Sequence, residues 1–313
     1  MTSRSSRAYA GVGDLRRMQA AVAGAFASTS LRVGDLAWLA RDHTHRELAL
    51  DIRIWEGDEG RLLGWTFYRS NGGFLVFVAP GCGDDALVDE MLAVIDEAAR
   101  TSVAAGDAPV SLHTYGIDTV RSAEDRLLAA ALRRRGFEAD RSGGVLSRRL
   151  DHQLREPTLP RGYRLAAVRT SEQVVGRVTA QRAAFAPSGL TLERYERVRR
   201  TWPYRPDLDR IVTTAAGVVV AFCTAWIDEE NAAGLLEPVG THPAHQRRGL
   251  GKAVCLDALR ALRDAGARTA QVAYESDAAH ALYRAVGFER GWQELVFRRD
   301  LQRTPSRPHG LAG

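Results

Sequence analysis

Cysteine and methionine are scarce in this sequence, with three of each among 313 residues. Cys82, Cys223 and Cys255 form no Cys-x-x-Cys pair, and an odd number of cysteines does not suit a disulfide framework. A zinc site needs several ligands at short spacings, which these cysteines do not supply. We therefore expect buried thiols in a reducing compartment, no bound metal, and a cytoplasmic protein.

Long apolar runs and runs of like charge are also missing. No stretch reaches the roughly 18 apolar residues that a membrane-spanning helix needs. Ala20–Ala27 is short, alanine-rich and preceded by charges, so we interpret it as part of an amphipathic helix rather than a signal peptide. The net charge of +5 lacks the basic stripe with interleaved aromatics that nucleic-acid binding favours. These absences predict no membrane partner and no nucleic-acid partner.

What remains is the composition of a globular protein with two domains. The chain is 45% hydrophobic and 26% charged, and domains usually have about 100–200 residues each. Asp151–Arg161 has two prolines and no periodicity, which is typical of a linker. The sequence thus predicts one domain over residues 1–150, a linker over 151–161, a second domain over 162–301, and a disordered tail over 302–313.

The two halves repeat one order of elements. Each predicts helices, then strands, a long helix, a strand, a second helix and a last strand. Arg135-Gly136-Phe137-Glu138 matches Val286-Gly287-Phe288-Glu289 at an offset of 287 − 136 = 151 residues. Pro80 matches Pro243 at an offset of 163. Slightly different offsets are typical of a duplicated fold whose loops have drifted in length.

Three local expectations in the first half can be compared with the structure. Residues 1–10 are polar and are expected to be loose. Val33–Leu39 is expected to form a short helix. Leu48–Trp55 alternates apolar and polar residues, which predicts a strand.

The segment from Glu237 to Lys252 combines a strand, a turn, a basic glycine loop and the start of a helix. The unpaired N–H groups and partial positive charge of a helix N-terminus favour phosphate oxygens. Gly249 and Gly251 allow the backbone to approach such oxygens, and nearby basic side chains add charge. The P-loop and dinucleotide-binding patterns need further glycine or hydroxyl residues that this loop lacks. The segment therefore predicts a pyrophosphate site of another kind.

This loop resembles the signature of the GNAT superfamily of N-acetyltransferases. The signature is Q/R-x-x-G-x-G/A after a strand that ends in V/T-x-P, and Gln246-x-x-Gly249-x-Gly251 after Thr241-His242-Pro243 satisfies it. A second family element, Ala281–Phe288, follows at the expected place. The resemblance covers Tyr163–Leu301 and extends, with fewer matches, over Asp14–Leu150. It implies an α/β (α+β) fold of two tandem GNAT-type mixed β-sheet domains flanked by helices.

The resemblance implies acetyl-CoA as cosubstrate and assigns residues to it. The pantetheine arm would pair with the strand backbone at Val239, Gly240 and Thr241. The pyrophosphate would lie on the loop, which gives the cofactor-binding residues Gln246, Arg247, Arg248, Gly249, Leu250, Gly251 and Lys252. Ser276 stands where many family members have an asparagine that contacts the cofactor.

The implied reaction is direct transfer of acetyl from the thioester to a primary amine of a small molecule. An alkyl amine is largely protonated at neutral pH, so a base must remove its proton. The candidate base is Glu237, which we place on the strand face of Leu235 and Val239. Tyr283 stands where the family has a general acid for the departing thiolate. A structural role for Glu237 and a core position for Tyr283 are the alternatives.

The acceptor site is expected near three aromatic residues. Trp202, Tyr204 and Trp226 lie in or beside the region that covers the acceptor in the superfamily, with inter-domain packing as the alternative. A protein N-terminus or a lysine is the alternative acceptor. A regulatory protein that binds acetyl-CoA without catalysis is the alternative function.

The first half has lost the features of a cofactor site. Gly81–Asp85 contains two carboxylates and no basic residue, and Leu132 stands at the position of Tyr283. Carboxylates repel pyrophosphate, so this copy is expected to be degenerate and to wall the acceptor cleft of the other. Such an interface favours a monomer over a homodimer.

Overall fold

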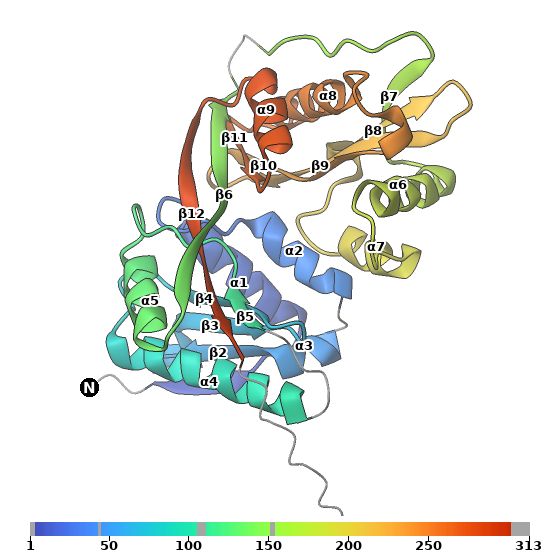
Figure 1. Ribbon diagram of the computed structural model, residues 1–313. Helices are drawn as coiled ribbons and strands as arrows, with labels where there is room; N and C mark the ends of the chain where they lie inside the picture. The colour runs from blue at the N-terminus through green and yellow to red at the C-terminus, as the bar shows by residue number, and fades with distance from the viewer. Residues whose placement is uncertain (1–3, 43–44, 105–110, 151–153, 302–313) are drawn as a thin grey trace, which may run out of the picture.

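The computed structural model describes residues 4–42, 45–104, 111–150 and 154–301. Two α/β halves share one continuous sheet, in which twelve strands of the described segments are hydrogen-bonded in sequence (Figure 1). The fold is therefore the mixed α/β fold that the sequence predicts, although the two sheets have joined into one.

The first half contains the predicted elements in the predicted order, with a short edge strand before them and an additional helix, α3, before β2. In chain order these elements are β1 (Ser5–Ala8), α1 (Val12–Gly24), α2 (Val33–Asp42), α3 (His45–Asp51), β2 (Ile52–Glu56), β3 (Leu62–Tyr68), β4 (Gly73–Val78), α4 (Asp85–Ala104), β5 (Ser111–Thr114), α5 (Ala123–Arg134) and β6 (Glu138–Arg149).

The second half repeats this order after residues 154–160, which contain neither helix nor strand. Its elements are β7 (Tyr163–Ala167), α6 (Ser171–Ala184), α7 (Leu192–Arg199), β8 (Asp209–Thr214), β9 (Val219–Asp228), β10 (Ala233–Thr241), α8 (Leu250–Asp264), β11 (Thr269–Tyr274), α9 (Asp277–Val286) and β12 (Arg290–Asp300). The pairing is repeated too, because β4 is parallel to β5 as β10 is parallel to β11.

Two local expectations in the first half were wrong. Part of the segment 1–10 is not loose, because Ser5–Ala8 forms β1 on the edge of the sheet beside β2. The strand expected over 48–55 begins only at Ile52, and Leu48 to Asp51 belong to α3. Leu48 is fully buried whereas Leu50 is 87% exposed. Successive strong helix formers outweigh the alternation of this short stretch.

The last strand of each half is exchanged. The sheet order is β1-β2-β3-β4-β5-β12-β6-β11-β10-β9-β8-β7, so β12 lies between β5 and β6, and β6 lies between β12 and β11. Figure 1 shows these two long strands running side by side from one half into the other. Each half therefore completes its sheet with a strand from the other. The domain boundary predicted near residue 150 stays a prediction from the sequence.

Helices cover both faces of the sheet in each half. In the first half, α4 and α5 bury one face and α1 to α3 the other. In the second half, α8 and α9 cover one face and α6 and α7 the other. Helix α2 is the exception, because Ala37 and Trp38 pack into the core formed by α6, α7 and the sheet of the second half. One helix of the first half thus reaches into the second.

The exchange makes Phe297 of β12 a core residue of the first half. Its side chain is fully buried among α4 and α5, and its N–H donates to Thr114 Oγ1 at 2.9 Å. We expect Phe297→Ala to lower the free energy of unfolding by about 3–5 kcal/mol, in one cooperative transition. Urea unfolding followed by circular dichroism measures this. Arg298→Ala, which changes an exposed neighbour, is the control, and separate transitions for the two halves would contradict the expectation.

Candidate active site

The basic glycine loop lies between β10 and α8 with its backbone turned outward. Arg247 and Gly249 adopt left-handed backbone conformations, with φ of 60° and 78°, and α8 begins at Leu250. No side chain of the described segments caps this helix. Because the first N–H groups of a helix have no acceptor within it, those of α8 are available to an anion. The pyrophosphate site predicted from the sequence stays a prediction, and the start of α8 leaves N–H groups open for it.

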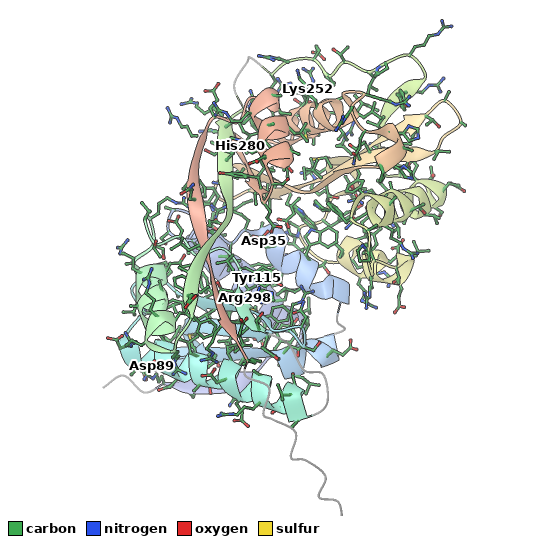
Figure 2. The ribbon with its side chains drawn as sticks, in the orientation of Figure 1. Asp35, Asp89, Tyr115, Lys252, His280 and Arg298 are labelled. Atoms are coloured by element: carbon green, nitrogen blue, oxygen red, sulfur yellow. The ribbon has the colours of Figure 1, made fainter. Side chains whose placement is uncertain are left out.

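Side chains around the loop hold its shape. Tyr163 Oη lies 3.0 Å from His245 Nδ1 and accepts a hydrogen bond from Arg248 Nη1 at 3.3 Å. Gln246 Nε2 donates to the backbone oxygen of Thr241 at 3.3 Å. Partial burial and the nearby Arg248 lower the pKa of His245, so this imidazole is neutral at pH 7. Figure 2 places Lys252 on α8, at the end of the second half farthest from the first.

The corresponding helix start in the first half is already occupied. Asp84 Oδ1 accepts a hydrogen bond from Leu87 N at 2.6 Å, which caps α4 with a carboxylate of the chain itself. This N–H group holds the pKa of Asp84 below its ordinary value, so the cap is charged at neutral pH. Arg4 binds the same carboxylate at 3.1 Å. An incoming phosphate would meet a negative charge here.

A β-bulge sets the position of Glu237. In the pairing of β10 with β9 the register shifts between Leu236 and Val239, so that Glu237 and Pro238 together lie opposite one residue of β9. The bulge puts Leu235 in the core under α6 and α7, and Val239 against the core under α8. The expectation that Leu235 and Val239 share a face was therefore wrong, because the extra residue reverses the alternation beyond Leu236.

Two indole groups hold the backbone of the bulge. The carbonyl oxygen of Glu237 accepts hydrogen bonds from Trp226 Nε1 at 2.5 Å and from Trp38 Nε1 at 3.4 Å. Trp226 lies on β9, whereas Trp38 comes from α2 of the first half. Helix α2 approaches closely because residue 34 is glycine: a Cβ there would lie 2.4 Å from Cγ of Trp226. Both halves therefore fix the backbone of Glu237.

The side chain of Glu237 lines a cavity of about 310 Å³ between the two halves. Helix α2, β3 and the loop after β5 supply its walls from the first half, and β10, β11 and α6 supply those from the second. Four acidic and two basic residues line it. The acidic residues are Asp35, Glu237, Glu275 and Glu294, and the basic residues are Arg32 and Arg69. The cavity is thus of a size for a small ligand and has a surplus of carboxyl groups.

Asp35 and Glu237 form a carboxyl pair in this cavity. Their side chains are hydrogen-bonded to each other, and burial raises the pKa of Asp35 despite this bond. A carboxyl group with a raised pKa tends to keep its proton, and Asp35 can then donate it in the hydrogen bond to Glu237. Figure 2 shows Asp35 on α2, between the halves. Sequence reasoning missed it, although an acidic residue inside the apolar segment Val33–Leu39 was a signal.

Tyr283 lies in the core of the second half and is not among the residues that line the cavity. It is 6% exposed, and burial together with Cys255, Cys223 and Glu237 raises the pKa of its phenol. The phenol therefore keeps its proton at neutral pH. Ser276 caps α9, because its Oγ accepts a hydrogen bond from Ala279 N at 3.2 Å. This hydroxyl is thus engaged by the helix start.

The three aromatic residues predicted for the acceptor site lie outside the set that lines the cavity. Trp226 stands behind the cavity wall, where its ring contacts Trp38 and Tyr204 at centroid distances of 6.2 Å each. Tyr204 donates to the buried Asp209 at 3.0 Å. Trp202 is 40% exposed and stacks under Arg16. Their contacts support the wall and join the halves.

A buried ion pair fixes the helices on this side of the cavity. Arg177 of α6 and Asp209 of β8 are both fully buried, 3.4 Å apart. Arg177 also donates to Gln181, a cavity residue, at 2.7 Å, and its guanidinium lies 3.8 Å from the ring centre of Phe222. Removing one partner of such a pair leaves an uncompensated buried charge. The network therefore holds α6 and Gln181 in place.

Comparison with known proteins identifies one segment of the chain. Residues 178–288 match the family model described as Acetyltransferase (GNAT) family. This segment is a GNAT acetyltransferase domain. It spans α6 to α9 and contains the glycine loop, Glu237 and Tyr283. No curated protein matches the chain.

Solved structures show that the whole chain has a tandem GNAT fold. A GCN5-related N-acetyltransferase from Sphaerobacter thermophilus superposes with a TM-score of 0.64 at 16% identity, over 95% of each chain. A tandem GNAT protein from the clavulanic acid biosynthesis pathway superposes with a TM-score of 0.60 at 14% identity, over 96% of this chain and 98% of that one. At these identities the likeness is one of fold.

The described residues contain neither a metal-binding cluster nor a membrane-spanning helix. No group of three or more His, Cys, Asp or Glu side chains there is arranged to hold a metal ion. None of the helices in the same residues is long and apolar enough to cross a membrane.

Behind the cavity, Asp125 gives stability a pH dependence. Burial, with Asp118 and Glu294 nearby, raises its pKa to about 7. The folded state therefore keeps this proton while the unfolded state loses it near pH 4. The contribution is fully present below pH 4 and is lost as the pH rises to about 7, with a slope of at most about 1.4 kcal/mol per unit.

We expect Asp125→Asn to become more stable relative to the parent protein as the pH rises from 5 to 7. Urea unfolding of both proteins at matched pH values measures the difference, which cancels the contribution of other titrating groups. Glu138→Gln, which changes an exposed carboxylate, is the control and should show no such pH-dependent difference. A stability difference that does not change with pH would contradict this assignment.

Proposed function

We propose that the protein transfers the acetyl group of acetyl-CoA to a primary amine of a small molecule bound in the central cavity. The observation that carries this proposal is the Asp35–Glu237 carboxyl pair. Glu237 of this pair lies on β10, the strand that leads to the basic glycine loop of the GNAT segment. A carboxyl pair of this kind can both attract an ammonium group and accept its proton.

The residues that the structure presents fit acetyl-CoA. Strands β10 and β11 pair only from Ala233 to Leu235, after which β11 pairs with β6 alone. Val239, Gly240 and Thr241 pair with β9 on their other side only. Their free edge can take the pantetheine arm, and the pyrophosphate can lie on the loop from Gln246 to Lys252 at the start of α8.

Acetyl-CoA supplies an activated thioester when it is bound. The acceptor enters as an ammonium ion, and the ionised carboxylate of the Asp35–Glu237 pair takes a proton from it. The neutral nitrogen attacks the acetyl carbonyl carbon, so that a C–N bond forms as the C–S bond breaks. The second amine proton leaves to solvent. In this proposal Tyr283, which keeps its proton, donates a hydrogen bond to the departing sulfur, and the released thiolate takes its proton from solvent.

The walls of the cavity favour a small acceptor. Helix α2 of the first half packs against α7 and β9 of the second half. Residues of both halves line the cavity. A volume of about 310 Å³ is at the lower end of ligand pockets, which measure about 300–1,000 Å³. One chain supplies every wall, and its three cysteines are free. We therefore propose a monomer acting in the cytoplasm.

The loop assignment predicts one acetyl-CoA per chain. Titration calorimetry should give 1:1 binding for the parent protein. We expect Arg248→Glu combined with Gly251→Asp to weaken binding at least about a hundredfold, because two carboxylates replace a cation and a close backbone approach. Arg263→Glu, at the other end of α8, is the control and should bind normally. Two molecules per chain would mean that the first half also binds.

The carboxyl pair predicts the pH profile of activity. We expect Glu237→Gln to lower kcat by about 10²–10⁴ while acetyl-CoA still binds. Asp35→Asn should shift the acidic limb of the kcat/KM profile to lower pH, because the amide donates to Glu237 and favours its ionised form. Release of the CoA thiol measures both, and Glu289→Gln, an exposed residue, is the control. Retained binding with no activity towards any amine would favour a regulatory protein.

A further inference from the structure

Arg32 is a buried cation at the start of α2. Its side chain is only 5% exposed, and it belongs to the lining of the central cavity. Nη1 donates to the backbone oxygens of Thr29 and Leu31, each at 2.6 Å. Nε donates to Gln271 Oε1 on β11 of the second half. These bonds fix the plane of the guanidinium in one orientation.

The third nitrogen of this guanidinium is unused. Arg32 Nη2 is buried and has no hydrogen-bond partner among the described residues. A buried donor without a partner costs about 1–3 kcal/mol, and more if it is charged. Burial lowers the pKa of Arg32 to about 10, so the group is still a cation at neutral pH. Its two N–H bonds therefore have no acceptor among the described residues, and a bound ligand can supply one.

The register of the sheet places this cation near the carboxyl pair. Gln271, which holds Nε, is paired with Leu235 of β10, two residues before Glu237. Asp35 is also close, because its Oδ2 accepts a hydrogen bond from Arg32 N at 2.6 Å. Because Arg32, Asp35 and Glu237 line the same cavity, one small ligand can lie between the guanidinium and the carboxyl pair. A cation and a proton acceptor at neighbouring points complement a ligand with an anion close to its amine.

We propose that the acceptor is a small zwitterion of the amino-acid type, whose carboxylate binds Arg32 while its amine meets the Asp35–Glu237 pair. This inference rests on the proposed function and names the chemical class of its acceptor. The carboxyl groups around the cavity do not prevent such binding. Burial raises the pKa of both Asp35 and Glu294, which reduces the negative charge that an incoming carboxylate would meet.

Matched pairs of acceptors test the proposal with the parent protein. Each pair is an amino acid and the amine that remains without its carboxylate, for example tyrosine with tyramine, lysine with cadaverine, and β-alanine with ethylamine. We expect kcat/KM, measured by release of the CoA thiol, to favour the amino acid of the best pair about 10–100-fold. A charge-assisted hydrogen bond of about 1.5–3 kcal/mol corresponds to that ratio.

Variants then locate the group responsible. Arg32→Gln should abolish the preference, mainly through KM of the amino acid, and Arg32→Lys should restore part of it. Arg69→Gln is the matched comparison, because Arg69 lines the same cavity but donates to Tyr115 at 3.0 Å. A loss of preference with Arg69→Gln and not with Arg32→Gln would overturn the assignment. Binding of acetyl-CoA by each variant shows that it is folded.

The outcomes separate this inference from the function on which it rests. If the parent protein acetylates the amines as well as or better than the amino acids, the zwitterion is wrong and the acetyltransferase stands. If it binds acetyl-CoA but acetylates neither member of any pair, both proposals fail. Since these results need only the parent protein, an Arg32 variant that does not fold leaves the test intact.

Discussion

The geometry of the cavity depends on one interaction: the backbone carbonyl of Glu237 accepts hydrogen bonds from two indoles, one from each half of the chain. Trp226 comes from the neighbouring strand, and Trp38 comes from α2, which packs against that strand because residue 34 has no Cβ. The same packing carries Asp35 to the side chain of Glu237. The β-bulge, the position of α2 and the carboxyl pair are therefore parts of a single arrangement, and a change in any of them alters the cavity.

The exchange of β6 and β12 explains why this arrangement can be rigid. Interfaces between domains of one chain are usually modest in area, so relative motion is the ordinary expectation. Here the last strand of each half belongs to the sheet of the other half. Strand β12 is hydrogen-bonded to β5 on one side and to β6 on the other. Moving one half would break a sheet in its middle. A cavity built from both halves can thus keep its geometry without a ligand.

How far the sequence predicts this molecule depends on how local each feature is. The glycine loop is set by neighbours in the chain, such as Gly249 with its left-handed backbone, so its place and form could be predicted. Glu237 could be identified, but its orientation could not, because a bulge depends on pairing with a strand and breaks the alternation used to assign faces. Asp35 and Arg32 lie about 200 residues from Glu237 along the chain, and only tertiary packing brings them together. The exchange of strands was equally hidden, because β6 and β12 can pair with either sheet by their residue patterns alone.

The two copies of the fold have therefore taken different tasks. The second keeps the start of α8 open to an anion, whereas the first closes the start of α4 with Asp84. What the first copy contributes instead is α2, with a buried cation and a carboxyl group at the cavity. These cavity side chains lie on a different copy from the glycine loop. Under the proposed function, substitutions in α2 would therefore alter the choice of acceptor while the loop stays unchanged, and the first copy would determine the specificity of the second.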